Sequence, residues 1–180
     1  MTKAKQTNLI SIWAGYFLLL AIGLCVAMPV LIWTLSTPLV NLGNYGAMAI
    51  LGERELALPK RLMGLSITML PITFLLIALY NLRRVFGEIA KGQAFSDANT
   101  RALHMVGLAG CAMILAQAIA WPLMSLAMSY DFPAGERIFS ISLGASPGGL
   151  LGFFAALMFL VLAQILQEAK RNAQDLAMIV

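Results

Sequence analysis

Four long stretches without a charged side chain constrain this chain more than any other feature. Residues 6–52, 62–82, 102–130 and 138–167 contain no Asp, Glu, Lys or Arg. A helix needs roughly 20 apolar residues to cross a hydrocarbon core of about 30 Å. The composition agrees, because 61% of the 180 residues are hydrophobic and 11% are charged, whereas about 25% are charged in a soluble domain. We therefore expect an all-α membrane protein, a bundle of four transmembrane helices in one membrane domain.

Local signals predict where these helices begin and end. The expected helices cover about residues 10–35, 61–91, 97–129 and 147–172. Gly92 is a typical C-terminal stop, Ser96 is a good N-cap, and Ser146 followed by Pro147 is a typical helix start. The second helix continues past its apolar span as an amphipathic extension. The alternation of residues 138–143 predicts a short strand, which we expect to form a hairpin with part of the first outer loop.

The basic residues predict the orientation. Of the 12 Lys and Arg residues, eight are expected on one side of the membrane: Lys3, Lys5, Arg83, Arg84, Lys91, Arg101, Lys170 and Arg171. The other four are Arg54, Lys60, Arg61 and Arg137. Loops rich in Lys and Arg stay in the cytoplasm. We therefore expect both termini and the middle loop in the cytoplasm, and the net charge of +4 gives no reason to invoke nucleic acid.

No catalytic motif is present. The two cysteines, Cys25 and Cys111, fall within apolar stretches, and we interpret them as small buried hydrophobes. The single histidine, His104, lies beside Arg101, and we expect it to anchor the third helix among lipid headgroups. A catalytic or metal-binding role would need a partner residue that the sequence does not supply. We predict no enzymatic activity, no metal and no cofactor.

Polar and small side chains inside the spans indicate how the helices associate. Gln117 and Gln164 are expected to hydrogen-bond between helices or to line a small polar site. Hydroxyl groups are expected to bond back to their own helices at Thr68, Thr73 and Ser125. Small residues recur every fourth position at Ala112, Ala116 and Ala120, at Gly148, Gly152 and Ala156, and at Gly23 and Ala27. We expect the third and fourth helices to pack closely, with a homo-oligomer or partner interface as the alternative use. Trp13 and Trp33, near the ends of the first helix, are expected at headgroup level.

The middle loop is the most informative hydrophilic segment. It combines basic and aromatic residues that we take as candidates for binding a partner: Arg83, Arg84, Phe86, Lys91 and Phe95. The alternative is a positive anchor that lies on the bilayer surface.

The same loop carries a resemblance to a known family. Residues 91–95 read Lys-Gly-Gln-Ala-Phe, followed by Asn99, Leu103 and Gly107. This arrangement resembles a family of uncharacterised bacterial four-helix inner-membrane proteins, designated only as a domain of unknown function. The resemblance implies the same topology over nearly the whole chain. Because members are often encoded beside a small helix-turn-helix regulator, it also implies a partner of that kind. The tail differs from the family, since Ala177 stands where threonine is usual.

Two functions follow from these features. We expect a non-enzymatic inner-membrane protein that docks or sequesters a cytoplasmic helix-turn-helix regulator. The alternative is a small transporter or an accessory subunit of a larger membrane complex, suggested by Gln117, Gln164 and the prolines within the helices. A polar cavity that joins the two glutamines would favour transport.

The orientation can be tested with single cysteines at Ser96 and Ser140. On whole cells, an impermeant thiol reagent is expected to label position 140 and not position 96, because only the outer loops face the medium. Labelling at 96 but not at 140 would reverse the orientation.

Overall fold

The protein is described by a computed structural model that covers residues 3–35, 57–93, 96–133, 135–137, 139 and 147–179. These residues form helices α1 (Lys3–Leu35), α4 (Leu58–Ala90), α5 (Asp97–Ser129) and α6 (Pro147–Ile179). Each helix has 33 residues, which corresponds to about 50 Å. The described residues contain no strand. Most of the predicted hairpin, residues 138–143 and the first outer loop, lies outside them, as does Phe95.

The described helices include four that are long and apolar enough to cross a membrane. This confirms, by length and composition, the prediction of an all-helical, multi-pass membrane protein. Three helices start earlier or end later than predicted: α1 begins at Lys3 rather than 10, α4 at Leu58 rather than 61, and α6 ends at Ile179 rather than 172. Pro59 is tolerated in the first turn of α4, because the amide hydrogen it lacks has no partner within the helix there.

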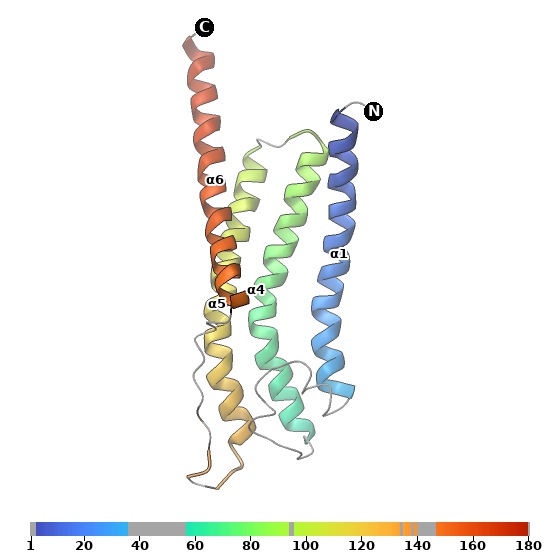
Figure 1. The fold of residues 1–180 in the computed structure, drawn as a ribbon, viewed down its shortest axis with the longest axis vertical. Helices are drawn as coiled ribbons and strands as arrows, with labels where there is room; N and C mark the ends of the chain where they lie inside the picture. Colours follow the sequence, from blue (N-terminus) through green and yellow to red (C-terminus); the bar gives the residue numbers. More distant parts are fainter. Residues whose placement is uncertain are drawn as a thin grey trace.

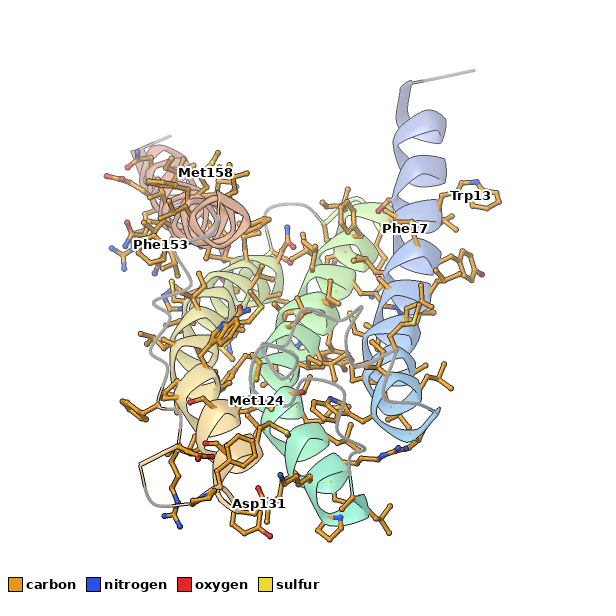
Figure 2. All side chains as sticks on the ribbon, turned by 60° about the horizontal axis from the view of Figure 1, so that its bottom comes forward. Trp13, Phe17, Met124, Asp131, Phe153 and Met158 are labelled. Carbon is orange, nitrogen blue, oxygen red and sulfur yellow. The ribbon has the colours of Figure 1, made fainter. Side chains whose placement is uncertain are left out.

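The helices are arranged as an open row in chain order. Helix α1 packs on α4, α4 on α5, and α5 on α6, while α1 and α6 do not contact each other. Figure 1 shows that neighbours run in opposite directions and that both chain ends lie at the same end of the row. In Figure 2, α6 is seen nearly end-on while the other three are seen lengthwise, so α6 is steeply inclined to them. The predicted bundle therefore has two separate edges, α1 and α6.

Trp33 holds the first three helices together. Its side chain is 1% exposed and packs with Met124 and Met128 of α5. The indole Nε1 donates to Thr68 Oγ1 at 3.1 Å, and the same hydroxyl donates to the Gly64 carbonyl at 2.8 Å. Met124 lies between α4 and α5 in Figure 2. Trp33 is therefore buried between helices, and its one polar atom is satisfied inside the protein. That it lies at headgroup level stays a prediction. Trp13, by contrast, is 69% exposed and points away from the row (Figure 2).

The predicted close packing of the third and fourth helices is confirmed, with the predicted Ala156 of α6 against two glycines of α5 that the prediction did not name. A Cβ on Gly107 would lie 2.5 Å from Leu160 Cγ, and one on Gly110 would lie 2.7 Å from the Ala156 Cβ. Two of the residues predicted to pack closely do not do so, since a Cβ on Gly23 or Gly152 would have nothing within 4 Å. On α5, Gly107 and Gly110 set how closely α6 approaches, rather than the predicted series Ala112, Ala116 and Ala120.

The contact between Gly64 and Trp33 predicts a specific loss of stability. A Cβ on Gly64 would overlap the buried indole ring, so Gly64→Ala is expected to destabilise the protein by about 1 to 3 kcal/mol. The matched control is Gly152→Ala, where the space is open and alanine is the better helix former. Unfolding in mild detergent measures both. Equal midpoints for the two variants would contradict the assignment of Trp33 as the central contact.

Candidate functional site

Charge separates the two ends of the row. The end that carries both chain termini (Figure 1) is called the basic end, and its described basic side chains are Arg83, Arg84, Lys91, Arg101, Lys170 and Arg171. The opposite end includes Lys60, Arg61 and Arg137. The two ends differ in whether these cations form bonds within the protein or remain exposed to bind another molecule.

At the opposite end, cations join neighbouring helices. Lys60 is only 8% exposed, and its Nζ donates to Asp131 Oδ1 at 2.6 Å and to the Met128 carbonyl at 3.0 Å. This ties the start of α4 to the end of α5, where carbonyl groups lack helical partners. Arg61 Nη1 donates to the Thr34 carbonyl at 3.2 Å, which ties α4 to the end of α1. These cations therefore serve the fold.

The first groove at the basic end lies between α1 and α4 and has a volume of about 580 Å³. Its lining includes Arg83, Arg84 and Lys91, together with Tyr16 and Tyr80. The structure thus brings together three of the five residues predicted to bind a partner. Sequence reasoning missed the contribution of α1, because no local signal shows which helix packs beside α4.

The remaining two candidates behave differently. Phe86 is half-buried, and its carbonyl accepts a hydrogen bond from the Ser11 hydroxyl of α1. Phe86 therefore belongs to the joint between α1 and α4 rather than to an exposed aromatic surface. Phe95 lies outside the described residues.

The guanidinium groups of this groove form no ion pair within the part of the chain that the structure describes. Lys91 forms an ion pair with Glu88 at 3.0 Å, and its own side chain is 67% exposed. Such an exposed pair contributes little to stability. Arg83 and Arg84 are exposed, and neither forms an ion pair with the described residues. Among the described residues, the groove therefore presents two guanidinium groups that form no ion pair, while its one carboxylate, Glu88, pairs with Lys91.

A second groove lies between α5 and α6 at the same end, with a volume of about 610 Å³. Its polar lining consists of Asp97, Thr100, Arg101, His104, Gln164 and Gln167. Asp97 Oδ1 is 2.5 Å from Lys170 Nζ, an ion pair that links the start of α5 to α6. The sequence analysis placed His104 among the headgroups and Gln164 inside the fourth span, with no reason to bring them into one groove.

Gln117 lies in a third groove, of about 370 Å³, between α4 and α5 within the apolar spans. Pro71 and Trp121 line it as well. His104 lines the α5–α6 groove together with Gln164. On α5, Gln117 is 13 residues from His104, or about 20 Å along the helix axis. Gln117 and Gln164 therefore line different grooves, and the described residues form no single polar cavity that joins them.

The described residues contain no group of three or more His, Cys, Asp or Glu side chains that could hold a metal ion. Cys25 and Cys111 are free thiols and are half-buried rather than fully buried. That the protein has no enzymatic activity stays a prediction.

The comparisons with known proteins give a family and no function. A family model described as "Protein of unknown function (DUF2975)" matches residues 53–180. The match includes α4, α5 and α6, and therefore both helices of the α5–α6 groove. No curated protein and no solved structure matches the chain.

The bonds of Lys60 predict that replacing Lys60 and replacing its partner Asp131 lower the stability by different amounts. Lys60→Met removes two charge-assisted hydrogen bonds and is expected to cost about 1.5 to 3 kcal/mol. Asp131→Asn should cost less, because the Lys60 ammonium keeps the Met128 carbonyl and the faces of Tyr130 and Phe132, whose centroids lie 5.8 and 5.6 Å away. Lys91→Met is the control, since Lys91 lies in an exposed pair. Unfolding midpoints are measured in detergent for each variant. If the midpoint of Lys60→Met is no lower than that of Lys91→Met, the bonds of Lys60 to Asp131 and Met128 do not hold α4 to α5.

Proposed function

The chain belongs to the DUF2975 family of proteins of unknown function, and we propose that it is a non-enzymatic membrane protein that docks an acidic segment of a cytoplasmic protein. The proposed docking site is the groove between α1 and α4. The observation that carries the proposal is the pair Arg83 and Arg84, which line this groove and form no ion pair with any residue that the structure describes.

The chemistry of the groove suits carboxylate groups. A guanidinium binds a carboxylate through two parallel hydrogen bonds, which are stronger than bonds between neutral groups. Tyr16 and Tyr80 add two phenol groups to the lining, and phenols both donate and accept. A peptide segment with neighbouring Asp or Glu side chains would therefore find a matching partner for each of the two arginines.

The depth of the groove supports a soluble partner. The charge-free stretch of α4 ends at residue 82, and α4 continues to Ala90. Eight further residues extend about 12 Å beyond the apolar span. This part of the groove, with Lys91 at its end, is expected to stand in water, where a soluble protein can reach it.

The orientation and the kind of partner are part of the same proposal. The excess of Lys and Arg at the basic end favours the cytoplasm, which in a bacterium makes the membrane the inner one. The resemblance of the middle loop to proteins encoded beside helix-turn-helix regulators favours a regulator as the partner, held at the membrane and away from DNA. A role as subunit of a larger membrane complex is the second candidate, because α1 and α6 are separate edges of the row.

The groove can be tested with an acidic probe. Wild-type protein in nanodiscs of zwitterionic lipid is titrated with a fluorescent oligoglutamate peptide, and binding is followed by anisotropy. Arg83→Glu plus Arg84→Glu is expected to weaken binding by about tenfold or more, since each lost charged hydrogen bond costs about 1.5 to 3 kcal/mol. The control, Arg101→Glu plus Arg171→Glu, changes the net charge equally at the same end. Equal loss in both variants would show that only net charge matters.

The partner can be tested in cells. A tagged chain is purified from native membranes, and co-purified helix-turn-helix proteins are quantified by mass spectrometry for the same variants. Docking in the groove predicts loss of the regulator with Arg83→Glu plus Arg84→Glu and retention with the control. Equal recovery would contradict the site, and a stoichiometric set of other membrane proteins without a regulator would favour the complex subunit.

A further inference from the structure

We propose that the groove between α5 and α6 at the basic end binds the phosphate headgroup of an anionic phospholipid. The groove has a volume of about 610 Å³, within the range of small-molecule sites. It lies between two helices long and apolar enough to cross the membrane. Basic pockets in this position are suited to anionic headgroups.

The groove offers donors of the required kind from both helices. Arg101 supplies a guanidinium that can bind a phosphate through two hydrogen bonds, and Thr100 and His104 lie beside it on α5. Gln164 and Gln167 supply amide donors from α6. A phosphodiester with a polar head group has several acceptor oxygens, so it can engage the two helices at once.

The acidic residue in the lining does not oppose an anion. Asp97 is held at 2.5 Å by Lys170, so its charge is compensated at the rim. Arg101 is exposed and forms no ion pair with the described residues. With the Lys170 ammonium counted, two cations face the one carboxylate of Asp97, so the groove and its rim keep a net positive charge.

The depth of these donors corresponds to a headgroup layer. The charge-free stretch that includes most of α5 begins at residue 102, and that of α6 ends at 167. Arg101 and His104 on one helix and Gln164 and Gln167 on the other therefore lie within a turn of the apolar boundary. The α1–α4 groove differs, because its Lys91 lies seven residues, or about 10 Å, beyond Arg84.

An exposed apolar surface continues from the groove toward the membrane interior. On α5, Met105 lines the groove with 44% exposure, and Leu108 is 47% exposed one turn deeper. On α6, Val161 and Leu157 follow Gln164 at helical spacing and are 52% and 37% exposed. Polar donors above an apolar stripe match a phospholipid, whose acyl chains extend from its phosphate. A soluble anion would use the donors but would make no contact with the stripe.

The probe is phosphatidylglycerol, with phosphatidylcholine and inorganic phosphate as comparisons. Delipidated wild-type protein in detergent is titrated with each, and bound lipid is counted by native mass spectrometry while the unfolding midpoint is recorded. Phosphatidylglycerol is expected to bind and to raise the midpoint, because a ligand that contacts both α5 and α6 stabilises their association. Arg101→Gln is expected to weaken its binding about tenfold or more. Gln167→Ala, at an exposed position, is a milder second variant if Arg101→Gln fails to fold.

The matched control is Arg84→Gln, which removes the same charge from the other groove. Full phosphatidylglycerol binding by Arg84→Gln together with loss in Arg101→Gln supports the site. Equal loss in both variants, or equal binding of phosphatidylcholine and phosphatidylglycerol, would overturn it. If inorganic phosphate at matched concentration gives the same protection as the lipid, the groove is a site for free anions and the lipid assignment fails. None of these outcomes depends on whether a protein docks between α1 and α4.

Discussion

The hydrogen bond from the Trp33 indole to Thr68 is the contact on which the inner part of the row depends. Lipid tails are as apolar as the side chains they surround, so helices in a membrane associate through close fit and polar contacts rather than through the hydrophobic effect. Gly64 makes room for the ring, Thr68 accepts its single donor, and the methionines at 124 and 128 close the contact from α5. At the other end, Val85 of α4, Leu103 of α5 and Ala163 of α6 form the corresponding cluster. Helices α4 and α5 take part in both clusters, and each edge helix contributes one buried side chain to one of them, Trp33 from α1 and Ala163 from α6.

Features set by local geometry were predictable from the sequence. Gly92 adopts a φ of +77°, which only glycine tolerates well, and the Ser96 hydroxyl accepts from the Asn99 amide at 3.1 Å. The hydroxyls of Thr68 and Thr73 bond back to their own helices, as expected. Contacts between helices were less predictable. Small residues show where a close approach is possible, but many faces of one helix carry them, so the choice of Gly107 and Gly110 depends on how α5 is rotated against α6.

For the grooves too, local features were predictable from the sequence and contacts between helices were not. The charges of Arg83, Arg84 and Lys91 marked the loop in the sequence, yet their arrangement in a groove requires α1, a helix about 70 residues away in the chain. The α5–α6 groove has no sequence signature, because Arg101 and Gln164 become neighbours only when the two helices pack. Gln117 was recognised as a polar group within the span, but its neighbour Pro71 comes from another helix.

The bonds of Lys60 and Arg61 have a mechanical consequence for α1, α4 and α5. They fasten these helices to one another at the end opposite the grooves. A change in the angle between two such helices then pivots at the fastened end, and displacement grows along the helix. For a helix of about 50 Å, a rotation of about 5° moves the far end by roughly 4 Å. The displacement is largest at the basic end, so a molecule held between α1 and α4 there would act against the bond from the Ser11 hydroxyl to the Phe86 carbonyl, which ties the two helices at that end.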